Sequence, residues 1–438
     1  MQNTRQLAFE VLSRVHSQKS YSNLLLDSYL NNNSLNATEK RQVSRLVYGV
    51  IERLKLLDFN LSVYLKQPLK KLKPQVLIAL RIGAYEILFS DSVPDSAAVN
   101  ESVEIVKKNS CAFASGLVNA VLRNISRNGI KYPDENDELY MSVRYSCEKW
   151  ICDEWTDHFG KEGAVRILEN SIDAAPVYIK VNTLKTTIKA LQEKLNEENV
   201  EWRAVDGIDD ALTIVVSSGS PADLKCFKEG MFHVQDLSSQ IACRLVGASE
   251  GENVLDVCAA PGGKSFTLCE NMNGKGKLVS CDIYPQRLKL ISQGAERLGI
   301  DMLETVLNDA SVENEEFQTF DKVLCDVPCS GLGIIRRKPE IRYKFIEDID
   351  KLLDLQYHIL CISSNYVRSG GKIVYSTCSL NRRENEDNCI RFLKEHDDFK
   401  PCCIHEYSEY GVCYENMLNI LPDRMNTDGF FVAVFERV

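Results

Sequence analysis

The sequence has 438 residues, 44% of them hydrophobic and 26% charged, which leaves room for about three domains and excludes a largely disordered chain. No run of about 18 apolar residues occurs and the polar start lacks a basic-then-apolar leader, so we expect no membrane span and a cytoplasmic protein. Taken over the whole chain, the net charge of −10 argues against nucleic-acid binding. The charge is unevenly distributed along the chain, however, so this argument does not hold for every part of it.

Residues 1–130 are predicted to form an all-α domain. Apolar residues such as Leu7 and Val11 recur at helical spacing, and a denser apolar run from Leu77 to Leu88 predicts a central buried helix. This third carries 17 Lys and Arg against 10 Asp and Glu, whereas the remainder of the chain is acidic. A basic helical domain on an acidic body is typical of an RNA-binding module joined to an enzyme; a helical domain that is merely rich in lysine is the alternative.

Residues 131–235 are predicted to hold a linker and a small α+β module. The linker belongs to the polar stretch Asn128–Glu138, which contains a glycine and a proline. Helical patterns follow over Ser146–Phe159 and Gly163–Ile172. Further along, strand patterns occur over Val177–Asn182, Ala211–Ser217 and Met231–Gln235.

Residues 236–438 are predicted to form a Rossmann-like α/β domain. From about Gly251 strands and helices alternate, which is typical of an open parallel sheet with helices on both faces. The expected strands are Val254–Val257, Lys277–Cys281, Lys322–Cys325 and Lys372–Tyr375, with a last antiparallel strand, Phe430–Phe435, at the edge of the sheet. The expected helices begin at Ser265 and run over Pro285–Leu298, Ile349–Val367 and Glu384–Glu395.

A glycine-rich turn follows the first of these strands, in the sequence VLDVCAAPGGK over residues 254–264. Such a turn lies at the carboxyl end of a strand, where ligands bind, and Gly262 and Gly263 let the backbone approach a ligand closely. The next strand ends at Asp282, suited to ribose hydroxyls, and the third ends near Asp309, suited to an adenine ring. Because the dinucleotide pattern G-x-G-x-x-G is absent, S-adenosylmethionine fits better than a dinucleotide. A purely structural glycine turn is the alternative.

Two of the sixteen cysteines have distinctive surroundings. No C-x-x-C pair occurs and the six histidines form no cluster, so we expect no zinc site and mostly reduced, buried thiols. Cys329, in DVPCS after Asp326, and Cys378, in STCS, each follow a buried strand and lie in a polar turn. Both thiols are therefore expected to face the cofactor crevice.

A thiol beside S-adenosylmethionine indicates methylation of a pyrimidine. Carbon 5 is too weak a nucleophile to accept a methyl group unaided, and a thiolate that adds to carbon 6 activates it. The site must lower the thiol pKa of ~8.5 or remove the proton during attack. A second thiol can take the carbon 5 proton or promote release, and Asp326 can bond the amino group or N3 of cytosine, which favours cytosine over uracil.

The motifs VCAAPGGK, DVPCS and STCS, in this order, resemble those of the RNA cytosine-C5 methyltransferases of the NOL1/NOP2/Sun family. The segments FHVQDLSSQ at 232–240, GLGIIRRKPEIR at 331–342 and TDGFF at 427–431 support a resemblance over nearly the whole chain. Residues 1–130 resemble a NusB-like RNA-binding domain. The resemblance therefore implies an all-α NusB-like domain, a small α+β middle module and a Rossmann-like S-adenosylmethionine-dependent methyltransferase domain.

The resemblance also implies roles for single residues. Cys378 would be the nucleophile and Cys329 would assist release of the product. Lys264 would contact the substrate side or Asp326 rather than the cofactor. The cofactor-binding set would be Cys258, Ala259, Ala260, Pro261, Gly262, Gly263, Lys264, Asp282, Arg287, Asp309 and Asp326. The substrate would be a cytosine of 16S ribosomal RNA, naked or in a small-subunit assembly intermediate, and the enzyme a monomer.

Other features concern RNA docking and the alternatives. The basic run Arg336, Arg337, Lys338 and Arg342 favours contacts with RNA phosphates, with a solvated surface as the alternative. Lys180 stands where the family usually has arginine. Lysine keeps the positive charge but cannot donate the two parallel hydrogen bonds of a guanidinium group. Two other functions remain open: methylation of transfer RNA or another ribosomal cytosine, and a non-catalytic NusB-like RNA-binding factor.

Overall fold

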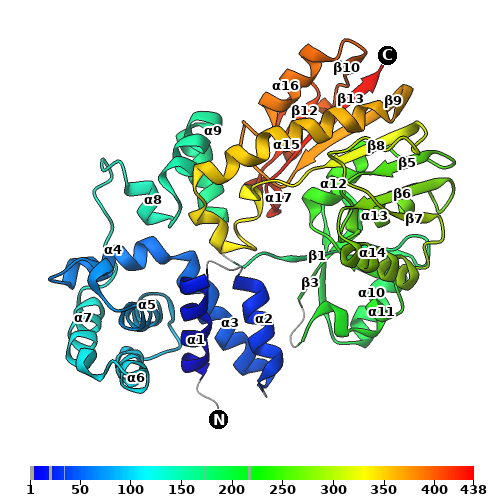
Figure 1. The fold of residues 1–438 in the computed structure, drawn as a ribbon. Helices are drawn as coiled ribbons and strands as arrows, with labels where there is room; N and C mark the ends of the chain where they lie inside the picture. The colour runs from blue at the N-terminus through cyan, green and yellow to red at the C-terminus, as the bar shows by residue number, and fades with distance from the viewer. Residues whose placement is uncertain (1–3, 19–21, 34, 173, 216–218) are drawn as a thin grey trace. The chain divides into compact units, whose positions relative to one another are not determined.

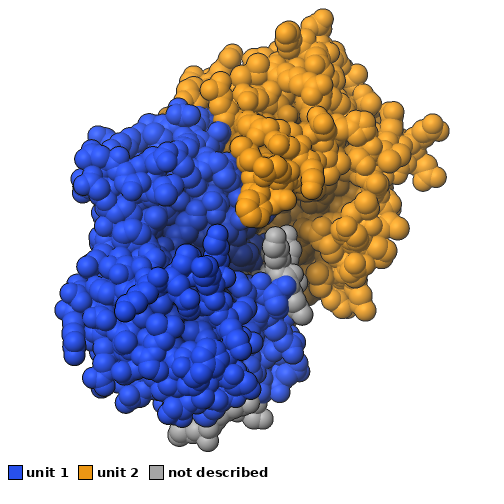
Figure 2. Space-filling model, turned by 60° about the vertical axis from the view of Figure 1, so that its left-hand side comes forward, with its two compact units in different colours: residues 1–172, 337–344 blue, residues 173–336, 345–438 orange. Residues whose placement is uncertain are grey.

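The structure is a computed structural model that describes residues 4–438 apart from 19–21, 34, 173 and 216–218. The chain divides into two compact units, which Figure 2 colours separately. Unit 1 comprises Met1–Ile172 together with Arg337–Lys344, and unit 2 comprises Asp173–Arg336 together with Phe345–Val438. None of the helices in the described part of the chain has both the length and the apolar character needed to cross a bilayer.

The described residues of unit 1 form helices without strands, as predicted (Figure 1). The apolar run from Leu77 to Leu88 forms α5 (Pro74–Phe89), in which Val76 through Glu86 are all buried. The side chains of α5 pack in one hydrophobic core together with side chains of the helices around it, so α5 is the central helix of unit 1. The other helices of unit 1 are α1 (Thr4–Gln18), α2 (Ser22–Asn32), α3 (Ala37–Glu52), α4 (Leu54–Tyr64), α6 (Asp95–Lys108), α7 (Ser115–Asn128), α8 (Tyr140–Arg144) and α9 (Lys149–Asn170).

Helix α9 accounts for both helical patterns predicted between residues 146 and 172. Gly160 interrupts it with non-helical dihedral angles, φ 73° and ψ 163°, a left-handed conformation that glycine adopts without strain. Both halves of α9 pack in unit 1 rather than with the strands that follow.

Unit 2 begins with a four-stranded antiparallel sheet in the order β2-β3-β1-β4. Its strands are β1 (Val177–Val181), β2 (Glu201–Val205), β3 (Ile208–Val215) and β4 (Phe232–Val234), and its helices are α10 (Ile188–Glu197) and α11 (Lys225–Lys228). The three predicted strands are β1, β3 and β4; residues 216 and 217 of the second prediction lie outside the described residues. Strand β2 was not predicted; it lies at the sheet edge, and three of its five residues, Glu201, Arg203 and Ala204, are exposed.

The larger sheet of unit 2 is mixed, in the order β11-β12-β13-β9-β8-β5-β6-β7, with β10 paired to β13. Strands β9, β8, β5, β6 and β7 are parallel, whereas β13 and β12 run antiparallel to their neighbours. The strands are β5 (Asn253–Asp256), β6 (Lys277–Asp282), β7 (Leu303–Leu307), β8 (Phe320–Asp326), β9 (Val367–Thr377), β10 (Phe399–Pro401), β11 (Gly411–Tyr414), β12 (Met417–Ile420) and β13 (Phe430–Arg437).

Helices cover both faces of this sheet, as the alternating pattern predicted (Figure 1). Successive strand residues point to opposite faces: Val254 packs in the core that contains α12, α13 and α14 side chains, and Leu255 packs in the core that contains α15 and α16 side chains. The helices are α12 (Leu237–Val246), α13 (Gly263–Asn271), α14 (Pro285–Leu298), α15 (Ile346–Asn365), α16 (Glu386–Glu395) and α17 (Pro422–Met425).

The predicted edge position of Phe430–Phe435 is wrong. The strand is antiparallel, as expected, but it lies between β9 and β12, and the hairpin of β11 and β12 extends the sheet beyond it. The parallel part of the prediction holds, so the carboxyl ends of β5, β6, β8 and β9 meet at one edge of the sheet.

Candidate active site

The turn after β5 requires glycine at Gly262. Its φ of +106° lies in the region that side-chain-bearing residues rarely adopt, and a Cβ there would lie 2.6 Å from Cζ of Phe266. Helix α13 begins at the next residue, so its first backbone N–H groups point toward the turn. A helix start beside a glycine turn of this kind is suited to holding a polar group of a ligand.

A pocket of about 220 Å³ opens beside this turn. The predicted residues that line it are Ala259, Ala260, Pro261, Gly263, Lys264 and Asp326. Four further polar residues that were not predicted as site residues also line it: Gln235, Asp236, Ser239 and Asp256. The first three lie in the FHVQDLSSQ segment, whose likeness to the family was their only signal.

Asp282 and Arg287 form a pair that braces the turn after β5. Asp282 ends β6 and is buried, and its carboxylate lies 3.0 Å from Nη1 of Arg287. Arg287 also donates a hydrogen bond to the backbone oxygen of Ala260, at 2.8 Å. Sequence reasoning assigned both residues to the cofactor, and in the structure they fix the turn that borders the pocket.

Five members of the predicted cofactor set do not line the pocket. Gly262, Asp282 and Arg287 belong to the turn beside it or brace that turn, whereas Asp309 and Cys258 lie elsewhere. Asp309 is exposed after β7 and accepts hydrogen bonds from the backbone and hydroxyl of Ser311, at 2.9 and 2.6 Å. Cys258 packs against the core on the α15 side, and burial raises the pKa of its thiol well above the usual value. Asn308 donates to the backbone oxygen of Asp282 at 3.3 Å, so the turn that carries Asp309 does lie beside the end of β6.

The structure brings the two predicted thiols together. Sγ of Cys329 and Sγ of Cys378 lie 3.0 Å apart, in turns that follow β8 and β9. The hydrogen bond with Cys378, together with burial, holds the pKa of Cys329 well above its usual value. Cys329 therefore stays protonated at neutral pH, and either sulfur can be the donor in the contact between the two thiols.

An ion pair joins the start of α13 to the end of β8. Nζ of Lys264 contacts Oδ2 of Asp326 at 2.8 Å, while Oδ1 of Asp326 accepts a hydrogen bond from Ser376 at 2.7 Å. Burial alone would lower the pKa of Lys264, but Asp326, with a smaller effect from Cys378, raises it above the usual value. Lys264 thus stays charged and contacts Asp326, one of the two positions that the sequence left open.

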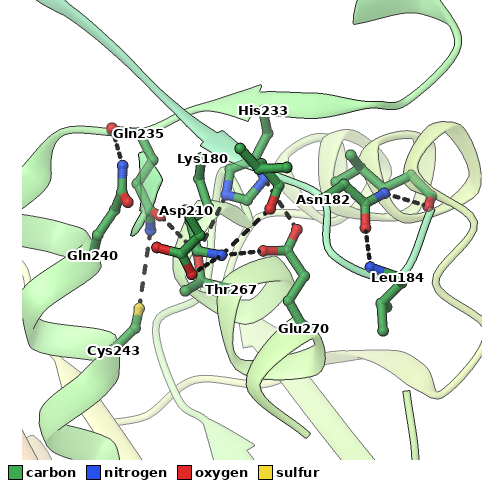
Figure 3. Close-up of polar contacts among 12 residues, drawn as sticks. Lys180, Asn182, Leu184, Asp210, His233, Gln235, Gln240, Cys243, Thr267 and Glu270 are labelled. Atoms are coloured by element: carbon green, nitrogen blue, oxygen red, sulfur yellow. Dashed lines mark hydrogen bonds and ion pairs between the residues drawn. The ribbon is translucent and has the colours of Figure 1, made fainter. Parts of the chain in front are cut away.

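A buried charged network, drawn in Figure 3, joins the four-stranded sheet to helix α13. Nζ of Lys180 on β1 lies 2.8 Å from Asp210 on β3 and 3.0 Å from Glu270 on α13. His233 on β4 lies 3.4 Å from Glu270 through Nδ1 and 3.2 Å from Thr267 through Nε2. We call this network the joint between the four-stranded sheet and α13. Because Lys180 is 2% exposed, the presence of lysine instead of arginine at this position affects the joint rather than the docking of RNA.

The prediction that the basic run contacts RNA is wrong for Arg342. Its side chain is fully buried in unit 1. It donates hydrogen bonds to the backbone oxygens of Tyr145 and Ser171 and to the Ser171 hydroxyl. The guanidinium group therefore holds protein backbone instead of phosphate.

All sixteen cysteines are free thiols, and most are buried. Among the described residues, no group of three or more His, Cys, Asp or Glu side chains is arranged to hold a metal ion.

Comparisons with known proteins agree with this architecture. The family model for the 16S rRNA methyltransferase RsmB/F matches residues 244–436, that for the NusB family matches residues 2–127, and that for the ferredoxin-like domain of RsmF/B-like methyltransferases matches residues 148–218. The crystal structure of a protein called PH0851 superposes with a TM-score of 0.82 at 25% identity, covering 100% of this chain and 99% of that one.

Two curated relatives match over nearly their full length. A Bacillus subtilis (strain 168) protein named "Probable ribosomal RNA small subunit methyltransferase B" is 34% identical over 98% of each chain. A Synechocystis sp. protein of the same name is 32% identical over 99% of each chain. The chain therefore belongs to the ribosomal RNA small subunit methyltransferase B family, with a NusB domain, a ferredoxin-like domain and a methyltransferase domain in that order.

Proposed function

We propose that this chain transfers a methyl group from S-adenosylmethionine to carbon 5 of a cytosine in 16S ribosomal RNA, through a covalent bond between Cys378 and carbon 6. The observation that carries the proposal is the 3.0 Å separation of the Cys329 and Cys378 sulfurs beside the Lys264–Asp326 pair. The names of the relatives support ribosomal RNA as the substrate, and the NusB match supports RNA binding by unit 1.

The residues around the turn fit an adenosine-bearing methyl donor. Gly262 and the start of α13 leave backbone close to the pocket, and Asp282 at the end of β6 provides a buried carboxylate for hydroxyl groups. When bound, S-adenosylmethionine supplies an electrophilic methyl group. The chain's own part is to hold it beside Asp326, which lines the same pocket.

The two thiols divide the covalent chemistry. The thiolate of Cys378 gives an electron pair to carbon 6, and the electron density that moves to carbon 5 accepts the methyl group. The carbon 5 proton then leaves to a base, the carbon 6–sulfur bond breaks, and its electron pair returns to Cys378. Cys329 retains its proton because its pKa is raised, and it lies within reach of the departing sulfur.

Asp326 accounts for the choice of base. Its carboxylate already accepts hydrogen bonds from Lys264 and Ser376, so it is held as an acceptor. An acceptor at this position pairs with the amino group of cytosine, whereas uracil presents a carbonyl there. The target base must leave its stack, which costs a few kcal/mol and less in a loop.

The experiment is a thiol substitution series with labelled RNA. Cys378→Ala should abolish methylation, because the nucleophile is gone. Cys329→Ala should accumulate a protein–RNA species that survives denaturing electrophoresis, because release is impaired. Cys325→Ala is a matched control on β8, the strand that leads to Cys329, because the buried thiol of Cys325 contacts Ser363 rather than Cys378. Full methylation by Cys378→Ala would refute the proposal.

Two measurements separate the other functions. Bisulfite sequencing of RNA from a deletion strain distinguishes a 16S cytosine from a transfer RNA or another ribosomal site. Calorimetric titration with S-adenosylmethionine tests the non-catalytic alternative, since a binding factor without methyl transfer predicts no heat of binding.

A further inference from the structure

Glu384 is a fully buried carboxylate that no step of the proposed chemistry uses. It lies in the turn between β9 and α16. Its Oε1 accepts hydrogen bonds from the backbone N–H of Ser330 at 2.8 Å and from Nε2 of Gln356 at 2.9 Å. Its Oε2 accepts hydrogen bonds from the hydroxyls of Ser330 at 2.5 Å and Ser379 at 2.7 Å.

The two serines are the residues that directly follow the two thiols. Ser330 follows Cys329 on the turn after β8, and Ser379 follows Cys378 on the turn after β9. Their hydroxyls also lie 2.9 Å from each other. One carboxylate therefore ties together both turns that carry the sulfurs.

We propose that Glu384 is a positioning residue that sets the distance between Cys329 and Cys378. Hydrogen bonds to a buried carboxylate are short and strong, and leaving their donors unpaired is costly. The carboxylate thus fixes the backbone next to each sulfur more firmly than turn geometry alone. The catalytic consequence rests on the proposed function, because it is the paired thiols that would act on the base.

The spacing can be measured without any methylation. Phenylarsine oxide condenses with two neighbouring thiols: two As–S bonds form, both thiol protons leave with the arsenic-bound oxygen as water, and nothing is oxidised or reduced. Peptide mapping by mass spectrometry then gives the rate at which Cys329 and Cys378 become bridged. We expect Glu384→Ala to slow this bridging at least tenfold. Glu384→Gln keeps the shape of the side chain, so its bridging rate should lie between those of Glu384→Ala and the wild type.

The kinetic effect should fall on turnover. A displacement of about 1 Å in reacting groups can cost about 100-fold in rate, so kcat of Glu384→Ala should fall by about that factor. KM for S-adenosylmethionine should stay within about twofold, because Glu384 does not line the cofactor pocket. Glu386→Ala is the matched control: Glu386 is a buried glutamate two residues away that accepts a hydrogen bond from Asn419 at 2.6 Å.

The outcomes separate the positioning role from the proposed function. Bridging rates within threefold of the wild type in both Glu384 variants would overturn the positioning role, as would an equal loss in Glu386→Ala. If Glu384→Ala fails to fold, Glu384→Gln decides, because its bridging rate must still fall below that of the wild type. A wild-type protein that modifies a different RNA atom would refute the proposed function while leaving the bridging result to judge Glu384.

Discussion

Asp256 is a carboxyl group that the fold holds largely out of water. It ends β5, is 1% exposed, and accepts a hydrogen bond from the Ser265 hydroxyl at 2.7 Å. Burial raises its pKa to about 7. The sequence letters showed an aspartate at the end of a strand, but they could not show that its surroundings favour the neutral form, because that depends on side chains from several elements.

The raised pKa predicts how stability changes with pH. Between about pH 4 and pH 7 the folded chain keeps a proton on Asp256 that the unfolded chain releases, so the free energy of unfolding falls as pH rises through this window. Asp256→Asn keeps an acceptor for Ser265 and removes the titration. The stabilisation from this substitution should be about 2 kcal/mol larger at pH 8 than at pH 5.5, as measured by denaturant unfolding. Asp309→Asn, at an exposed carboxylate, is the control, and a gain that is equal at both pH values would contradict the prediction.

At the residue scale, the approach of the Cys329 and Cys378 thiols could be predicted, whereas the position of Glu384 could not. Cys329 and Cys378 each follow an apolar strand, and parallel strands place their ends together. Glu384 lies among charged residues in the sequence NRREN, which suggests an exposed turn. Only the folded arrangement shows that this side chain points inward to the serines beside the thiols.

At the scale of elements, helix α13 links the cofactor turn to the four-stranded sheet. Its first residue borders the pocket, and Glu270 near its end pairs with Lys180 of β1. Burial on its own would lower the pKa of Lys180, but Glu270 and Asp210 raise it above the usual value. Lys180 therefore stays charged, and its ion pairs hold α13 against the four-stranded sheet.

Breaking this joint should be costly. Lys180→Met leaves Glu270 buried without its cation and should destabilise unit 2 by about 3–5 kcal/mol. Adding Glu270→Gln should recover part of that loss, since the uncompensated charge is then absent. Denaturant unfolding of the two single variants and the double variant measures the coupling. The control is Lys194→Ala, which breaks an exposed ion pair with Glu197 at 2.7 Å and should cost no more than about 1 kcal/mol. If the losses in stability of Lys180→Met and Glu270→Gln simply add in the double variant, the two residues are not coupled and the prediction is wrong.

Element patterns were predictable where periodicity was strong. The predicted helix from Pro285 to Leu298 is α14, residue for residue, because Pro285 at its start and Gly299 after its end mark both boundaries. The hairpin of β11 and β12 was missed, since each strand has only four residues and little alternation. That omission is also why Phe430–Phe435 was placed at the sheet edge.

At the scale of the whole molecule, the chain crosses between units within the methyltransferase segment. Residues 337–344 pack in unit 1, although the residues on both sides belong to unit 2. Tyr343 donates a hydrogen bond to the backbone oxygen of Ile51 at 2.6 Å, and Trp150 donates one to the backbone oxygen of Lys344 at 2.9 Å. No local pattern could predict this, because Arg342 and its partner Ser171 are 171 positions apart and a run of arginine and lysine ordinarily indicates a solvated surface.

The buried arginine in this segment should therefore matter to unit 1 and not to RNA affinity. Arg342→Met fills most of the same space but leaves the backbone oxygens of Tyr145 and Ser171 without their donor, at a cost of about 3 kcal/mol. Hydrogen exchange should become faster in peptides covering these two residues, while peptides covering β5 and β6 keep their protection. Lys338→Met, at a half-buried position in the same segment, is the control for loss of a positive charge. Uniformly faster exchange in both units would show that Arg342 does not act through unit 1, and a loss of RNA affinity with unchanged exchange would restore its assignment to phosphate.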